Sequence, residues 1–335
     1  MQIVKSWVIG AAIALALGGA ACSSTTGPTP PPPPPPPPPG PLLSCGDGVS
    51  RATVNANGMT VSFDTPSASG GQGAVTVTCS PASGENFPIG TTAVTCKATD
   101  TLNRTAECSF PVTVSKLPTL SRVRYLAFGD SVTSGEVSFP VGSTSFHGLG
   151  GITKQVVVPS AAYPTILAKT LQGRYSSQAE QIVVANYGLG GEKTVNARDR
   201  FFQALAIVRP EAVLLMEGYN DIPGGANGAA SGAASEIDIM AAEARNRGIR
   251  VFLATLVPPR PGGNRSIDLI YITDYNNRMR VVASRQGAVL VDLYSELLPD
   301  VNRYIGVDGL HPNEAGYAKI ADVFFQAIQA NLEVR

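Results

Sequence analysis

Apolar residues follow two different patterns along the chain. From about Leu120 onward, short runs of apolar and β-branched residues alternate with longer segments in which apolar residues recur at helical spacing. The runs predict strands at 123–128, 181–185, 212–216, 251–256 and 288–293, and the longer segments include helices at 163–171, 233–245 and 315–330. Apolar strands separated by helices predict an α/β fold with a parallel sheet covered on both faces, because right-handed crossovers put helices there. Ligands of such sheets bind beyond the carboxyl ends of the strands, so we expect the chemistry at that edge.

Residues upstream of Leu120 instead alternate between apolar and polar positions. The segments 75–79, 94–98 and 108–114 each carry a cysteine in phase with their apolar residues, which predicts that these cysteines face a core. Turn-forming residues separate the segments, so we expect a small antiparallel β-sandwich. The cysteines at 45, 79, 96 and 108 have neither paired CxxC spacing nor histidine neighbours, which favours structural disulfides over a metal or catalytic site. Four cysteines allow three pairings, and their spacing does not choose among them.

The first 22 residues have the pattern of an export signal. Lys5 supplies a positive charge, residues 7–17 are apolar and residues 18–21 are small. The apolar stretch is shorter than the roughly 20 residues that a membrane span needs. The fifth cysteine, Cys22, follows directly, as in lipoproteins whose new N-terminal cysteine is acylated, although Gly19 stands where leucine is usual. We expect export, with a lipid anchor on Cys22 at the cell envelope; ordinary cleavage after a small-x-Ala triplet would instead release a secreted protein.

The chain divides into four parts. Residues 28–41 are nearly all proline, which favours an extended polyproline II spacer. We therefore expect a signal peptide at 1–22, a proline-rich linker at 23–43, the β-sandwich at 44–116 and the α/β domain at 117–335. Lysine plus arginine total 25 and aspartate plus glutamate total 25, so no net charge favours nucleic acid or an anionic membrane surface as a partner. The membrane contact that we expect is a tether through Cys22.

Residues suited to acyl transfer occur near the C-terminus and after the first predicted strand. Ser131 directly follows that strand in a Gly-Asp-Ser triplet. A serine hydroxyl needs a base to take its proton, and the base works best when a carboxylate orients it. Of the two histidines, His311 has Asp308 three residues before it, at a turn that precedes a helix, whereas His147 lies in a Gly- and Ser-rich loop without a nearby acid. Ser131, His311 and Asp308 are therefore the candidate nucleophile, base and orienting group.

Candidate donors for a negatively charged reaction intermediate follow the neighbouring strands. Gly191 lies after the second strand and Asn220 after the third. The tetrahedral intermediate of acyl transfer carries an oxyanion that needs preorganised donors. We expect the backbone N–H groups of Ser131 and Gly191 and the side-chain amide of Asn220 to serve, with Gly190 as the rival glycine.

These segments together resemble the SGNH or GDSL hydrolases, which are named for the serine, glycine, asparagine and histidine of four sequence blocks. All four blocks occur in order over about 210 residues, with Val132 in place of the usual leucine. The resemblance implies a three-layer, flavodoxin-like fold with a five-stranded parallel sheet and an esterase or lipase activity. It also implies Ser131 as nucleophile, Gly191 and Asn220 as oxyanion donors, and Asp308 and His311 as the rest of the catalytic set.

Residues 45–114 resemble the hyalin-repeat (HYR) module, an immunoglobulin-like domain of extracellular proteins. The resemblance rests on the segments 79–84, 87–94, 98–100 and 108–110. It implies disulfides that pair Cys79 with Cys96 and Cys45 with Cys108. We expect this module to be a folded spacer, with binding of a surface partner or of substrate as the alternative.

We expect the chain to hydrolyse carboxylic esters without a cofactor or metal. Two histidines are too few for a typical hydrolytic zinc centre, even with Asp130 and Asp308 near His311. The only tryptophan is Trp7, in the signal segment, which favours acyl esters or lipids over acetylated carbohydrates, the alternative substrates of an O-deacetylase. Loops at 134–160, with Phe139 and Phe146, and at 258–263 should border the substrate cleft. A non-catalytic surface adhesin is the alternative of another class, and the intact set of catalytic residue types argues against it.

Overall fold

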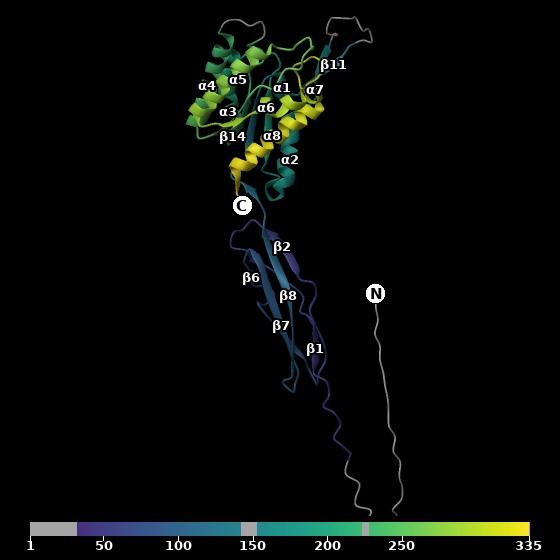
Figure 1. The fold of residues 1–335 in the computed structure, drawn as a ribbon. Helices are drawn as coiled ribbons and strands as arrows, with labels where there is room; N and C mark the ends of the chain where they lie inside the picture. Colours follow the sequence, from purple (N-terminus) through teal and green to yellow (C-terminus); the bar gives the residue numbers. More distant parts are fainter. Residues whose placement is uncertain (1–31, 142–152, 223–227, 335) are drawn as a thin grey trace, which may run out of the picture.

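The computed structural model describes residues 32–141, 153–222 and 228–334 (Figure 1). The expected signal segment and Cys22 lie outside the described residues. Residues 32–40 of the expected linker form neither helix nor strand and are mostly exposed. The first strand begins at Pro41, so regular structure starts within the segment that we expected to be linker.

The C-terminal region is built on a five-stranded parallel sheet. Its strands are β10 (Arg124–Gly129), β13 (Val183–Gly188), β14 (Ala212–Met216), β15 (Arg250–Ala254) and β16 (Val289–Val291). They lie in the order β13-β10-β14-β15-β16, and every neighbouring pair is parallel. This is the flavodoxin-like order, in which the first strand lies between the second and the third. The predicted fold class is confirmed, and all five strands lie where the apolar runs predicted them.

Helices cover both faces of this sheet. The long ones are α2 (Tyr163–Arg174), α3 (Thr194–Val208), α4 (Ala229–Asn246), α5 (Leu269–Gln286) and α8 (Glu314–Leu332). Helix α2 packs against α8, with the rings of Tyr163 and Phe324 stacked 5.1 Å apart, while α3 and α5 both pack against α4 on the other side (Figure 1). The central strands are buried between these layers, as β10 illustrates with Tyr125–Phe128 fully enclosed, whereas the edge strand β13 is partly exposed. Burial on both faces explains why the central strands are mostly apolar instead of alternating.

Shorter elements complete this region. They are α1 (Ser131–Ser134), η1 (Ser176–Gln178), α6 (Leu293–Leu297), η2 (Leu298–Asp300), α7 (Val301–Tyr304) and the antiparallel pair of β9 (Thr119–Leu120) with β17 (Glu333–Val334). Within the three described ranges, no helix is both long and apolar enough to cross a membrane.

The N-terminal region is all β. Its strands are β1 (Pro41–Ser44), β2 (Val49–Thr53), β3 (Met59–Thr60), β4 (Ser67–Gly70), β5 (Thr76–Ser80), β6 (Asn86–Phe87), β7 (Gly90–Thr99) and β8 (Thr105–Lys116). Strands β2-β8-β7-β5 form one sheet, and β1 with β4 and β3 with β6 form two-stranded sheets. The pairs β5–β7 and β7–β8 are antiparallel as predicted, but β2 lies parallel to β8. The expectation of a wholly antiparallel sandwich is wrong at this edge, because tight turns enforce antiparallel pairing only between consecutive strands.

Two disulfides crosslink the all-β region. Cys45 bonds to Cys108 and Cys79 bonds to Cys96, the pairing that the HYR resemblance implies. Cys96 is fully buried in a small core with Val94 and Val112. A module of this size buries little apolar surface, so covalent crosslinks that restrict the unfolded chain make a large contribution to its stability.

The segment expected as a loop at 134–160 contains a β-hairpin. Strand β11 (Glu136–Pro140) pairs antiparallel with β12 (Thr153–Val157), and Phe146 and His147 lie outside the described residues. The interpretation as a loop is therefore wrong for the paired residues, whose β-branched positions form a ladder as ordinary strands do. Phe139 is 49% exposed. It therefore lies on the surface of the hairpin, outside the hydrophobic core.

Candidate active site

Three side chains from distant parts of the sequence form a hydrogen-bonded chain at the carboxyl edge of the sheet. The Nε2 atom of His311 lies 2.9 Å from the hydroxyl oxygen of Ser131. The Nδ1 atom of the same ring lies 2.6 Å from the Oδ2 atom of Asp308. An ionised carboxylate only accepts hydrogen bonds, so Nδ1 carries the proton and Nε2 is left to accept from the serine hydroxyl. This is the protonation pattern that a general base needs.

Ser131 is held at a sharp turn between β10 and α1. Asp130 caps α1, since its carboxylate accepts from the backbone N–H of Val132 at 3.0 Å and from that of Tyr219 at 3.3 Å. A Cβ atom on Gly129 would lie 2.0 Å from the carbonyl oxygen of Met216, so only glycine allows β10 and β14 to end this close together. The turn therefore places Ser131 beside the loop that carries Asn220.

His311 and Asp308 lie in a turn that precedes α8. The Oδ1 atom of Asp308 accepts from the backbone N–H groups of Leu310 and His311, both at 3.1 Å. Burial alone would raise the pKa of Asp308, but the hydrogen bond and charge of His311, with these two N–H groups, hold that pKa below its usual value. Asp308 and His311 are almost completely enclosed. The carboxylate therefore stays ionised and keeps one orientation at neutral pH.

The two glycines proposed as rival oxyanion donors have different surroundings. Both follow β13, whose last residue, Gly188, pairs with Gly129 at the end of β10. A Cβ atom on Gly190 would lie 3.8 Å from the Cβ atom of Ser131, whereas one on Gly191 would meet nothing within 4 Å. Gly191 has a φ of +77°, which favours glycine there. Gly190 is thus near the serine, and Gly191 forms the turn that follows.

Asn220 is hydrogen-bonded to the loop after β13 that carries Gly190, Gly191 and Glu192, called the glycine loop below. Its side-chain amide nitrogen donates to the carbonyl oxygen of Glu192 at 2.9 Å. An amide nitrogen has two N–H groups, so one remains available to a ligand. The next residue, Asp221, accepts from the backbone N–H and the hydroxyl of Thr194 at the start of α3. The loops after β13 and β14 are therefore fastened to each other next to Ser131.

Arg200 braces the glycine loop, a role that sequence reasoning missed. Its guanidinium, on α3, forms an ion pair with Glu192, donates to the carbonyl oxygen of Tyr187 at 2.7 Å and reaches that of Gly129 at 3.3 Å. It also lies over the ring of Phe128, 4.0 Å from its centre. One side chain therefore links the ends of β10 and β13. An arginine within a helical segment does not indicate such contacts in the sequence.

Glu136 is a second residue that sequence reasoning missed. Its Oε2 atom lies 3.5 Å from Nε2 of His311, and its side chain is 18% exposed. A Cβ atom on Gly190 would lie 2.1 Å from its Oε1 atom, so the carboxylate rests against the glycine loop. Among the described residues, no lysine or arginine pairs with this carboxylate, and the His311 ring forms an ion pair with it only when the ring is protonated. A carboxylate thus borders the Ser131–His311 hydrogen bond from the side of the hairpin.

Two further buried carboxyl groups lie behind this edge. Burial raises the pKa of Asp130 to about 6, against the opposing hydrogen bonds from the backbone of Val132 and Tyr219. Burial, together with the charge of Asp130, raises the pKa of Glu217 well above its usual value, and neither of its carboxyl oxygens has a hydrogen-bond partner among the described residues. Burial therefore favours the neutral form of the Glu217 carboxyl group.

A polar cavity adjoins the site. It has a volume of about 510 Å³, and both Asn220 and Leu310, the neighbour of His311, line it. Most of the remaining wall is polar and comes from the segment 264–268 and from Tyr271. No residue of the loop at 258–263 lines this cavity, although the backbone N–H of Arg260 donates to the carbonyl oxygen of Gly309 at 2.9 Å, near His311. A polar cavity therefore lies beside Asn220 and the turn that carries His311.

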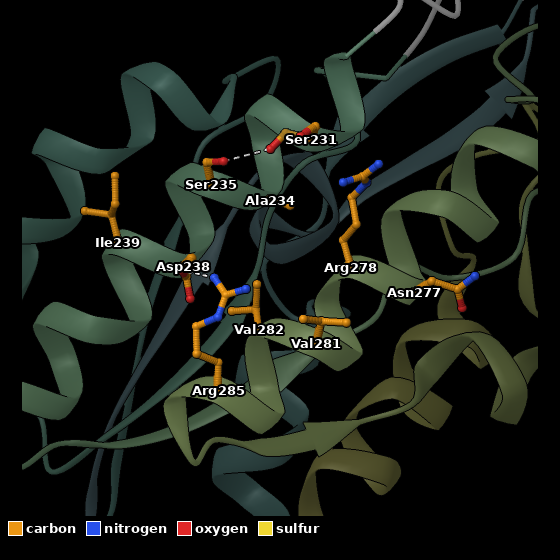
Figure 2. Close-up of a pocket in the computed structure, with 10 residues that line it drawn as sticks. All are labelled: Ser231, Ala234, Ser235, Asp238, Ile239, Asn277, Arg278, Val281, Val282 and Arg285. Carbon is orange, nitrogen blue, oxygen red and sulfur yellow. Dashed lines mark hydrogen bonds and ion pairs between the residues drawn. The ribbon is translucent and has the colours of Figure 1, made fainter.

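A second cavity of about 520 Å³ lies between α4 and α5 (Figure 2). Two of its polar side chains are engaged in its wall: Arg285 pairs with Asp238 at 2.7 Å, and the hydroxyl of Ser235 donates to the carbonyl oxygen of Ser231. None of the candidate catalytic residues lines it.

The sequence also raised Asp130, Asp308 and His311 as a possible metal site. In the described ranges, no three His, Cys, Asp or Glu side chains gather in a way that could hold a metal ion.

The fold and this edge define a class of protein. A flavodoxin-like sheet here brings a serine, a histidine and an aspartate together at its carboxyl edge, where ligands of such sheets bind. Residues 127–319, more than half of the chain, match the model of the GDSL-like Lipase/Acylhydrolase family, and the chain belongs to this family. Residues 38–114 match the HYR domain, so the second resemblance is confirmed as well.

Solved structures share the hydrolase fold. A lipase/acylhydrolase from Enterococcus faecalis is 21% identical with a TM-score of 0.51, and the match covers 63% of this chain and 97% of that one. LAE5, an α/β hydrolase enzyme from the metagenome of Lake Arreo in Spain, is 22% identical with a TM-score of 0.49, covering 63% and 96%. The acetyl xylan esterase AlAXEase is 21% identical with a TM-score of 0.48, covering 61% and 99%. The search of curated proteins returned no match.

Proposed function

We propose that this protein is an exported carboxylic ester hydrolase with Ser131 as nucleophile, His311 as general base and Asp308 as the group that orients the base. The observation that carries the proposal is the hydrogen-bonded chain from Ser131 through His311 to Asp308, with distances of 2.9 and 2.6 Å. Family membership supports hydrolysis, and the polar groups around Ser131 support acyl transfer in particular.

The proposed reaction has two halves. In the first, His311 takes the hydroxyl proton of Ser131 as its oxygen attacks the ester carbonyl, and the protonated ring then gives that proton to the leaving alcohol oxygen. An acyl-serine remains. In the second half, His311 takes a proton from a water molecule that attacks the acyl-serine, and returns it to the Ser131 oxygen as the carboxylic acid leaves. Asp308 holds the ring in position and stabilises its charged form in both halves.

The oxyanion of each tetrahedral intermediate needs donors. The backbone N–H of Ser131, a backbone N–H of the glycine loop at Gly190 or Gly191, and the free N–H of the Asn220 amide are our candidates. Both loops are held next to Ser131 by the amide of Asn220 and by the Arg200–Glu192 ion pair. Donors fixed before the reaction stabilise the transition state without reorganisation.

The Asn220→Ala variant should lose about 10²- to 10³-fold in kcat, because one oxyanion donor disappears while substrate binding is retained. Steady-state hydrolysis of a soluble acetyl ester measures this as a fall in kcat with little change in KM. Asn246→Ala, at the exposed end of α4, is the matched control and should behave as wild type. A kcat for Asn220→Ala within threefold of wild type would remove Asn220 from the proposed site.

The polar cavity favours a second, narrower function. Its wall carries Asn264, Arg265, Ser266 and Asp268, and the side chains of Arg265 and Asp268 form no ion pair or hydrogen bond with described residues. Unpaired polar groups suit a hydroxylated ligand better than a long acyl chain. This observation supports the carbohydrate O-deacetylase alternative against the acyl or lipid esters that the absence of tryptophan favoured.

A substrate panel tests both functions on the wild-type protein. We expect hydrolysis of p-nitrophenyl esters, with rates that fall as the acyl chain lengthens from acetate to dodecanoate, and release of acetate from acetylated xylan. Rates that rise with chain length, without release of acetate, would establish the lipid preference instead. An absence of activity on every ester would leave the non-catalytic adhesin as the better proposal.

Export and anchoring belong to the same proposal. The signal pattern at 1–22 and the position of Cys22 support it, and two disulfides in the all-β region are typical of oxidising compartments. In this proposal the HYR domain and the proline-rich segment space the hydrolase region away from a lipid anchor on Cys22. The HYR domain also offers a surface for a partner.

A further inference from the structure

Glu136 lies where the alcohol part of an ester must pass. In the proposed mechanism Nε2 of His311 donates its proton to the leaving oxygen, so that oxygen comes within hydrogen-bonding distance of Nε2. The Oε2 atom of Glu136 is 3.5 Å from the same nitrogen. The leaving oxygen and the carboxylate of Glu136 therefore lie beside the same nitrogen atom, Nε2 of His311. Glu136 therefore borders the alcohol side of the substrate.

The carboxylate of Glu136 is poorly compensated by the protein. No lysine or arginine side chain of the described ranges pairs with it, and its carboxyl oxygens accept no hydrogen bond from those ranges. Tyr317, whose hydroxyl donates to the backbone oxygen of Glu136, has a pKa raised well above its usual value by burial and by the charges of Asp130, Glu136 and Asp308. Glu136 is therefore one of three carboxyl groups near this phenol.

The position of Glu136 also suits contact with a ligand. Its side chain is partly exposed whereas His311 is enclosed, so a substrate reaches it directly. It lies between the glycine loop and the nucleophile turn, because its Oε1 atom touches Gly190 while β11 follows α1 after a single residue, Gly135. A carboxylate accepts hydrogen bonds from hydroxyl groups and attracts cations, and it repels anions.

We propose that Glu136 determines specificity for the alcohol part of the ester: it admits neutral hydroxylated or cationic alcohols and rejects alcohols that carry a negative charge. This inference rests on the proposed ester hydrolysis. It agrees with the polar cavity beside Asn220, and it restricts carbohydrate substrates to sugars without an acidic group next to the ester.

Three acetyl esters of one shape test this inference. They are 4-acetoxybenzoate, 4-acetoxybenzamide and (4-acetoxybenzyl)trimethylammonium, which place a negative, a neutral and a positive group at the same position. For each, kcat/KM is divided by the rate constant for hydrolysis by hydroxide. We expect the corrected kcat/KM of wild type to be roughly tenfold higher for the neutral ester than for the anionic ester, and at least as much higher for the cationic ester than for the anionic one. Charges a few ångströms apart near a protein surface interact with about this strength.

Glu136→Gln should bring the ratio of neutral to anionic kcat/KM close to one, because glutamine preserves the shape of the side chain but carries no charge. Glu180→Gln is the matched control: it makes the same charge change on an exposed residue before β13, at the opposite edge of the sheet, and should keep the wild-type preference. An unchanged ratio of neutral to anionic kcat/KM in Glu136→Gln would overturn the inference.

The remaining outcomes are also decisive. Loss of activity on all three esters in Glu136→Gln, with folding intact by circular dichroism, would assign Glu136 to the chemical step and overturn a role in specificity. A wild-type protein without activity on any of the esters would contradict the proposed function itself. Failure of the inference and failure of the proposed function are therefore distinguishable.

Discussion

Ser131→Ala is expected to abolish ester hydrolysis, with kcat reduced by roughly 10⁴- to 10⁶-fold. Without the hydroxyl no acyl-enzyme forms, and water must attack the bound ester without covalent catalysis. The substitution removes one oxygen atom, and the cap from Asp130 to the backbone of Val132 remains. The folded structure and substrate affinity should therefore be retained. Initial rates on a p-nitrophenyl ester and labelling with a fluorophosphonate probe measure the loss independently.

The neighbouring Ser134 provides the control for this experiment. Its hydroxyl donates to the backbone oxygen of Ser131 at 2.9 Å, in the same short helix, but it forms no hydrogen bond with His311. Ser134→Ala should therefore react with the probe as wild type does. Labelling of Ser131→Ala at the wild-type rate would show that another residue is the nucleophile. If neither wild type nor Ser134→Ala is labelled, the non-catalytic binding role becomes the better explanation.

His311→Ala should show the second-largest effect, a loss in kcat of similar order, because among the described residues the His311 ring is the group hydrogen-bonded to the Ser131 hydroxyl. The pH dependence carries additional information. In wild type kcat/KM should fall toward acid, since a protonated imidazole cannot act as a base. The pKa of Asp308 is held below its usual value, so Asp308 remains ionised across the pH range in which imidazoles titrate. The residual activity of His311→Ala should lack this acidic limb.

The other histidine tests the assignment of the base. His147→Ala should retain wild-type activity and the wild-type pH profile. Asp308→Asn keeps the shape of the side chain but no longer fixes the proton on Nδ1, and it should lose about 10⁴-fold in kcat. Activity of His311→Ala near the wild-type value would reject the assignment, and a large loss in His147→Ala would transfer the role of base to that residue.

The fold was predictable because its signals are local. The central strands of the parallel sheet are mostly apolar because both of their faces are buried, and the helices have their own spacing, so both patterns appear in consecutive residues. The parallel pairing of β2 with β8 has no comparable pattern in the sequence. The two strands are distant in the sequence, and an alternating pattern specifies which side faces a core but not the direction of the neighbouring strand.

Some residues of the candidate site were likewise predictable from the sequence, and others were not. Ser131, and His311 with Asp308, were predictable because their residue types are rare in combination and each follows a strand or precedes a helix. Arg200 and Glu136 were not, since arginine and glutamate are common on surfaces and only the structure shows that one braces the glycine loop and the other borders the His311 ring. Family membership supports the hydrolase assignment but leaves these two contacts to experiment.

The sequence by itself determined the α/β class, the all-β module with its four cysteines and the residue types for acyl transfer, because each depends on periodicity or on short motifs that neighbouring residues carry. Only the tertiary structure decided which charged side chains surround the serine, how polar the adjoining cavity is and which glycine lies nearest to the nucleophile. These properties depend on where residues distant in the sequence meet, as the separation of 180 positions between Ser131 and His311 illustrates, and contacts over such separations are set by the packing of the sheet and its helices.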